Sequence, residues 1–226
     1  KQDIYYYTRI CEKEGTDSDA CLAFAERFHN MTFEKENAEA IAAYLENGTE
    51  DDETDHLQKV TIHSDAEHLT WGELRPQIKG EVSRSIKELS GNYMTVIYDY
   101  EVECTGEQEE AETYQIREYM KVRYAEGKEY LLDYERTMEQ ELDPSGKVLD
   151  NQGILLGIAK EEIPYMTNEA GTIVSFVQAG ELWNYDQKED ALSLVFSFAD
   201  SEGYDIRNLC KEHEIQIVSV NGPLLK

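Results

Sequence analysis

Regular alternation of apolar and polar residues between Tyr93 and Leu142 constrains this chain more than any other feature. In a strand, successive side chains point to opposite faces, so the pattern predicts a three-stranded antiparallel meander with one apolar face. Something else in the chain must cover that face. The alternating apolar positions are Met94, Val96, Tyr98, Tyr100, Val102 and Cys104, then Tyr114, Ile116, Met120, Val122 and Tyr124, then Tyr130, Leu132, Tyr134, Met138 and Leu142.

The segments before the meander are predicted to supply this cover. Apolar residues at helical spacing predict one helix over about residues 18–30 and a second over 34–46, followed by a short strand over 57–62. The principal cover is expected from a helix over residues 74–89, ended by Gly91. Its apolar stripe consists of Leu74, Ile78, Val82, Ile86 and Leu89.

After the meander the composition changes, which predicts a second, β-rich module. Residues 173–177 and 181–185 are expected to form a hairpin, and residues 192–198 and 215–220 two further strands. The predicted fold class is therefore α+β, with helices packed on a curved antiparallel meander sheet, followed by a small all-β antiparallel module. The predicted domains are residues 1–150 and 151–226.

The formal net charge of −27 limits the partners of the chain. It argues against nucleic acid, whose phosphates require clustered basic side chains, and against docking on an anionic membrane surface. No run of about 18 apolar residues occurs, so no membrane insertion of this segment is expected. The chain begins at Lys1 without a hydrophobic leader, and we expect an anchoring segment to lie outside it.

The four cysteines leave the redox compartment open. Cys11 and Cys21 flank a polar loop and could form a disulfide, whereas Cys104 lies on the apolar face of the meander and is expected to be buried. There is no CxxC pair, so neither a zinc knuckle nor a thioredoxin-type site is supported, and no cofactor is expected.

The order of elements over residues 16–142 resembles the cystatin-like cone of the nuclear-transport-factor-two superfamily. The resemblance rests on element order, without a diagnostic motif. It implies a curved sheet around an interior cup. That superfamily includes small enzymes, ligand-binding pockets and extracytoplasmic assembly modules, so the resemblance by itself does not select one function.

Residues 161–198 resemble the first propeller blade of large, membrane-anchored extracytoplasmic bacterial proteins. The residues that carry the resemblance are Ile163-Pro164-Tyr165, Thr167-Asn168-Glu169, Gly171 to Val177, Gly180 to Trp183 and Leu194 to Phe198. The resemblance implies an extracytoplasmic location for this chain. A propeller needs several blades, and this chain has residues for about one. Either the chain is a fragment, or these strands pack on the first module.

Polar residues interrupt the apolar face of the meander at Glu118 and Arg136. Inside a cup, a buried carboxylate could act as a general base or anchor a ligand; alternatively, the two form a cross-strand pair or lie near the open end of the sheet. The tyrosines of this face could line a pocket or form the core. The candidate pocket residues are Glu118, Arg136, Tyr98, Tyr100, Tyr114 and Tyr134.

Two other clusters suggest cation sites. His56, His63, Asp65 and His68 fall within thirteen residues, but Asp65 also fits a helix start and no HExxH spacing occurs. The acidic stretch 50–55 lacks the glycine-centred calcium loop. A solvated polar segment is the alternative for both, and no metal ligands are assigned.

The sequence contains no Ser-His-Asp pattern, phosphate-cradling loop or GxSxG elbow. We therefore expect a non-catalytic interaction or structural module, located outside the cytoplasm, with a protein or a small molecule as its partner. The alternative is a cone-shaped pocket that binds or converts a small ligand through Glu118 and the tyrosine face.

Overall fold

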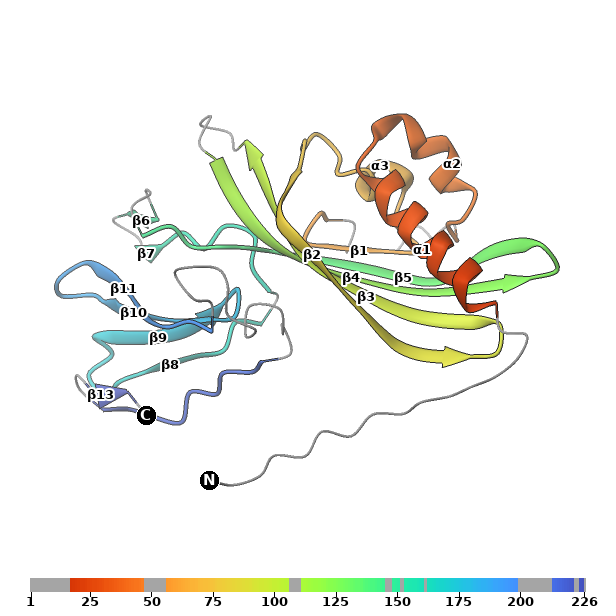
Figure 1. Cartoon of the computed structure of the whole chain (residues 1–226). Helices are drawn as coiled ribbons and strands as arrows, with labels where there is room; N and C mark the ends of the chain where they lie inside the picture. Colours follow the sequence, from red (N-terminus) through yellow and green to blue (C-terminus); the bar gives the residue numbers. More distant parts are fainter. Residues whose placement is uncertain are drawn as a thin grey trace, which may run out of the picture.

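The part of the chain that the structure describes contains a large, five-stranded and a small, four-stranded antiparallel sheet, together with two two-stranded pairs, β6-β7 and β12-β13. The helices are grouped against the large sheet (Figure 1). The computed structural model describes residues 17–46, 56–105, 111–144, 148–150, 153–160, 162–198, 213–221 and 224–225. The α+β fold class is confirmed. The acidic stretch at residues 50–55, together with Cys11 and Cys210, lies outside the described residues.

The large sheet contains the predicted meander. Its strands are β1 (Lys59–Thr61), β2 (Gln77–Ser90), β3 (Tyr93–Thr105), β4 (Ala111–Ala125) and β5 (Lys128–Gln140), in the order β1-β5-β4-β3-β2. The three predicted meander strands are β3, β4 and β5, and β1 is the predicted short strand. Between β4 and β5, Glu126 and Gly127 both have positive φ, which is the backbone of a two-residue hairpin turn.

A bulge changes which residues of β5 face the core. Lys121 pairs with Asp133, but the next residue of β4, Val122, pairs with Leu131. Leu132 is the extra residue, and it is exposed while Leu131 is buried. The regular alternation predicted Leu132 on the apolar face, and this prediction is wrong. An extra residue in one strand reverses the side to which the following side chains of that strand point.

The helix predicted over residues 74–89 is wrong, because strand β2 occupies this segment and pairs with β3. The apolar residues of the segment are mostly four apart, and this spacing keeps side chains on one face of a strand as well as on one face of a helix. Gly91, with a φ of 62°, forms the hairpin turn to β3 instead of a helix cap. The sheet thus gains a long strand, and its cover comes from other elements.

The predicted N-terminal helices are present, with different lengths. Helix α1 (Ser18–Thr32) confirms the first prediction. The second is shorter than expected, a single 3₁₀ turn η1 (Lys35–Asn37) followed by α2 (Ala38–Ala42). A short helix, α3 (Ala66–Leu69), starts where the capping pattern indicates, and the Asp65 side chain accepts a hydrogen bond from the His68 backbone N–H at 2.8 Å.

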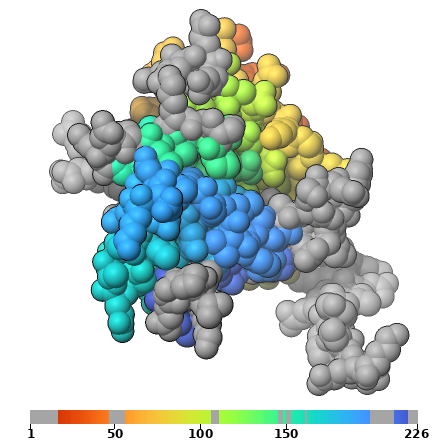
Figure 2. All heavy atoms as spheres, turned by 90° about the vertical axis from the view of Figure 1, so that its left-hand side faces the viewer, coloured from red at the N-terminus to blue at the C-terminus, as the bar shows by residue number. Residues whose placement is uncertain are grey.

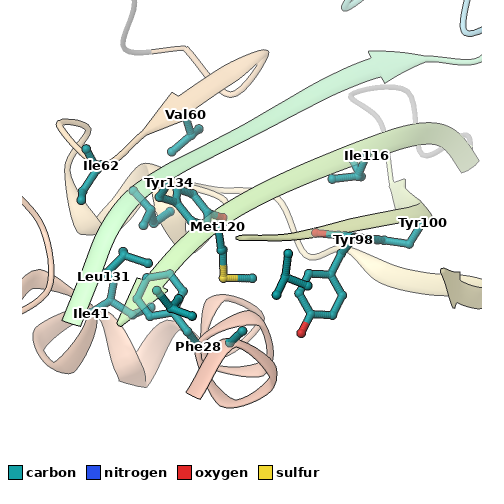
Figure 3. Packing of buried hydrophobic residues seen from close by; sticks show 14 of the residues in the cluster. Phe28, Ile41, Val60, Ile62, Tyr98, Tyr100, Ile116, Met120, Leu131 and Tyr134 are labelled. Atoms are coloured by element: carbon teal, nitrogen blue, oxygen red, sulfur yellow. The ribbon is translucent and has the colours of Figure 1, made fainter. Parts of the chain in front are cut away.

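The main core lies between α1 and the large sheet. Phe24 and Phe28 of α1 are buried, and the Phe28 ring contacts Tyr44 at a centroid distance of 5.8 Å. It also contacts Tyr134 at 5.5 Å (Figure 3). Cys21 and Cys104 belong to this core as free thiols. The Cys21 thiol donates to the Asn92 carbonyl at 3.4 Å; its candidate disulfide partner Cys11 lies outside the described residues.

The C-terminal part forms a four-stranded antiparallel sheet in the order β11-β10-β9-β8. The predicted hairpin is confirmed as β9 and β10, and the strand predicted at 192–198 as β11. The strand predicted at 215–220 is wrong: residues 213–219 make no ladder with the described strands, and only Val220 belongs to one. The element bounds are β6 (Leu149–Asp150), β7 (Gly153–Ile154), β8 (Tyr165–Thr167), β9 (Ile173–Gln178), β10 (Glu181–Asp186), β11 (Ala191–Phe196), β12 (Val220–Asn221) and β13 (Leu224–Leu225).

Buried Gln178 connects the two sheets. Its side-chain amide donates to the carbonyl oxygens of Gln140, at the end of β5, and of Leu156, at 2.9 and 2.8 Å. A small second core of Leu142, Phe176 and Trp183 lies nearby. Figure 2 views the molecule from this side, with the blue C-terminal strands adjoining the green end of the large sheet. The domain boundary at residue 150 stays a prediction.

Phe28→Ala should lower the free energy of unfolding by about 3–5 kcal/mol, because it removes a fully buried ring from the contact between α1 and the sheet. Urea denaturation measures the loss. Asn30→Ala, at an exposed position of the same helix, is the matched control and should change stability by less than about 0.5 kcal/mol. Equal effects of the two substitutions would contradict this packing.

Candidate functional site

Glu118 and Arg136 lie opposite each other in the large sheet, on β4 and β5. Both side chains are fully buried. Carboxylate and guanidinium groups are costly to remove from water unless they are paired and hydrogen-bonded. The groups that pair with these two side chains therefore determine how their burial is made favourable.

The Glu118 carboxylate is held by three side chains from three elements. His29 Nδ1, on α1, lies 2.5 Å from Oε2, the Tyr134 hydroxyl donates to Oε1 at 2.9 Å, and the Tyr100 hydroxyl donates to Oε2 at 3.3 Å. Burial alone would raise the pKa of Glu118. The effect of burial is outweighed by the hydrogen bond and electrostatic attraction of His29, by the charge of Arg136 and by the hydrogen bond from Tyr134. Together these interactions lower the pKa of Glu118 below its ordinary value.

Arg136 uses its guanidinium to hold the segment around α3. Its two terminal nitrogens donate to the carbonyl oxygens of His68 and Leu69, each at 2.8 Å. The guanidinium carbon lies 3.7 Å from the ring centroid of Trp71, a cation–π contact. Trp71 is buried with a φ of 70°, a backbone conformation that is costly for a non-glycine residue and that the surrounding contacts maintain.

Aromatic rings enclose His29. The Tyr98 ring is stacked on the imidazole at 4.7 Å and 4° between planes, and Tyr100 and Phe33 meet it edge-on. Burial, and then the charge of Glu118, raises the pKa of Tyr98 to about 12. These tyrosines therefore act as neutral hydroxyls and ring surfaces at ordinary pH.

The structure brings together five of the six candidate pocket residues. Glu118, Arg136, Tyr98, Tyr100 and Tyr134 meet in the interior beside the main core, whereas Tyr114 lies apart and donates its hydroxyl to Glu112 at 2.6 Å. We name the group His29, Tyr98, Tyr100, Glu118 and Tyr134 the Glu118 cluster. His29 was not among the residues predicted from the sequence, although it follows Cys21 and Ala25 at the spacing of one helix face.

The chemistry of the Glu118 cluster is that of a carboxylate–imidazole pair. When Nδ1 donates to a carboxylate, the neutral imidazole keeps Nε2 as an acceptor. The Nε2 atom of His29 has no hydrogen-bond partner among the described residues. However, His29 is only 4% exposed and Glu118 0%, so the pair lies within the packed core.

The histidine-rich segment does not converge on one point. His63 faces Glu46, with 4.0 Å between Nδ1 and the carboxylate, and His68 pairs with Asp65 at 2.9 Å. His56 forms an isolated bridge with Lys59. Within the described part of the chain, no three His, Cys, Asp or Glu side chains gather in a way that could hold a metal ion.

Comparisons with known proteins find no matching family model, curated protein or solved structure. Among the described helices, none is long and apolar enough to cross a membrane.

Glu118→Gln should lower the free energy of unfolding at pH 7 by about 3–5 kcal/mol, because it removes one charge from a buried hydrogen-bonded network. The folded pKa of Glu118 is depressed. Its stabilising contribution is therefore complete above the ordinary carboxyl pKa and is lost as the pH falls through the lower, folded pKa. Urea denaturation from neutral to acidic pH should show the difference between wild type and variant shrinking over that acidic range.

Glu103→Gln, an exposed carboxylate on neighbouring β3, is the control for this experiment. It should follow the wild-type pH profile throughout. A difference between wild type and Glu118→Gln that stays constant down to strongly acidic pH would contradict the depressed pKa.

Proposed function

We propose that this chain is a non-catalytic interaction module of an extracytoplasmic, membrane-anchored bacterial protein. The observation that carries the proposal is a row of exposed aliphatic side chains along β2. We name it the β2 surface; its residues are Ile78, Val82, Ile86 and Leu89, which are 40%, 37%, 49% and 46% exposed. The resemblance of residues 161–198 to a propeller blade supports the proposed location.

The β2 surface continues the face of the sheet that forms the core. In antiparallel pairs, residues directly opposite each other share a face. Ile86 lies opposite Val96 and Leu89 opposite Met94, and both partners are buried. Helix α1 packs against β3 and β4. The aliphatic residues of β2 thus lie on the core side of the sheet but remain open to solvent, as expected of a contact surface.

Charge supports the same conclusion. Strand β2 carries three basic residues and two acidic ones, within a chain whose net charge is −27. Repulsion of an acidic partner is therefore weaker at this strand than elsewhere on the molecule. The pairing of edge strand β2 with β3 shifts register between Lys79 and Ser83 and between Ile86 and Glu88. Such bulges hinder addition of another strand, so the partner is expected to contact the side chains of this surface.

The Glu118 cluster supports a non-catalytic function through its burial. Its carboxylate is saturated by partners within the chain, and its imidazole is covered by aromatic rings. Groups that act on a substrate must reach it at hydrogen-bond distance. The cluster is better suited to fixing α1 on the sheet.

The double substitution Ile86→Lys and Leu89→Lys should abolish partner binding while leaving the fold intact. Each side chain is about half exposed, so the expected loss of stability is about 1 kcal/mol or less per site. In vivo crosslinking from Lys87, which lies between them, followed by identification of the product, measures binding. A double substitution at exposed Leu194 and Val195 of β11 is the matched control. Crosslinked products that are identical for wild type and the β2 variant would contradict the proposal.

A second candidate function is a cone-shaped pocket that binds or converts a small ligand through Glu118 and the tyrosine face. The observation in its favour is the buried Nε2 of His29, which lacks a described hydrogen-bond partner. Such an atom could accept a proton or a hydrogen bond from a ligand.

Side-chain nitrogen NMR during a small-molecule screen separates the two functions. For the interaction module we expect no compound to shift the His29 Nε2 resonance, because the imidazole is enclosed. His63, whose side chain is 47% exposed, serves as the internal control for nonspecific effects. A saturable shift confined to His29, and lost in Glu118→Gln, would establish the pocket instead.

A further inference from the structure

A cleft of about 510 Å³ lies between the two parts of the chain, away from both the Glu118 cluster and the β2 surface. One wall is the segment before β1, residues 56–58, and the other is the connection between β7 and β8, residues 156–160 with Ile163. Its volume falls in the range of about 300–1,000 Å³ that is usual for small-molecule sites, which often lie between structural units.

Apolar side chains from both cores form the interior of the cleft. Leu57 and Ile158 pack against the main core, and Leu156 and Ile163 pack against the second core. All four are partly buried, so each presents part of its apolar surface to the cleft. Covering this surface would remove it from water, which favours a ligand with an apolar body.

Hydrogen bonds hold the connection that forms the second wall, although it has no regular secondary structure. The Gln140 N–H donates to the Ile158 carbonyl at 2.7 Å, and Gln178 donates to the Leu156 carbonyl at 2.8 Å. The Gln58 side chain, from the first wall, donates to the Ala159 carbonyl. A wall fixed in this way loses little entropy when a ligand binds.

The lining carries one ammonium group, that of Lys160, and no carboxylate. Lys160 and His56 belong to the lining and are exposed to solvent. The Lys160 ammonium group lies 3.5 Å from the Glu139 carboxylate. In a chain with a net charge of −27, this ammonium group offers a local position for a negative group.

We propose that this cleft binds a small amphiphilic anion, with its aliphatic body against Leu57, Leu156, Ile158 and Ile163 and its carboxylate at Lys160. The proposal does not depend on the interaction function of the β2 surface. Because Lys160 is exposed, the apolar body is expected to supply most of the affinity and the ion pair to supply selectivity.

Titration of the whole, isotope-labelled chain with octanoate tests the proposal by NMR. We expect saturable shifts confined to the amides of residues 56–58 and 156–160. Octanol, which has the same chain length without the charge, should bind about five-fold more weakly, and Lys160→Met should remove this difference. The proposal would be overturned if wild type bound octanoate and octanol with equal affinity. It would also be overturned if the chemical-shift changes spread over the exposed aliphatic residues of β2 and β11.

Ala159→Trp tests the position of the site, because the large ring would fill the cleft. We expect it to weaken octanoate binding at least about tenfold. Leu155→Trp is the matched control, since Leu155 is adjacent but 67% exposed and outside the lining, and it should bind octanoate like wild type. Chemical shifts of residues remote from the cleft report whether each variant is folded. Unchanged binding by folded Ala159→Trp would overturn the proposal.

Discussion

The contact between His29 and Glu118 ties helix α1 to the centre of the large sheet, and the main core is arranged around it. A buried carboxylate is unfavourable unless its oxygens are satisfied. The tyrosines of β3 and β5 and the histidine of α1 provide that satisfaction together. Displacing α1 would therefore expose apolar surface and also remove one of the three hydrogen-bond partners of a buried carboxylate, which makes this position of the helix strongly preferred over alternatives.

Arg136 performs a corresponding task on the neighbouring strand. It binds the backbone carbonyls at the end of α3 and carries the Trp71 ring on its guanidinium. Two opposite charges in adjacent strands thus hold two different covering elements, α1 and the α3 segment. The cover they fix lies over the middle of the sheet, and β2, at the edge, keeps exposed aliphatic residues. The same buried charges that stabilise the fold therefore help to define where the β2 surface remains open.

Much of the candidate cluster could be predicted from the sequence, because Glu118 and Arg136 interrupt an otherwise regular apolar alternation. Both were therefore expected to point into the interior of the sheet. His29 could not be assigned as the partner of Glu118, since 89 positions separate them and only the packing of α1 brings them together. Tyr114 was grouped with the cluster because periodicity gives the face of a strand but not the position along it.

The sequence by itself determined the meander, helix α1 and the C-terminal hairpin, because each depends on spacing and turn residues within a few positions of one another. Only the tertiary structure decided that residues 77–90 form a strand and that Leu131 replaces Leu132 in the core. A spacing of four satisfies both helix and strand, and a bulge changes the facing of a strand without changing its composition. In both cases the hydrogen bonding to a neighbouring strand selects one of two conformations that the local sequence allows. The energy of that pairing is not contained in the sequence of the segment itself.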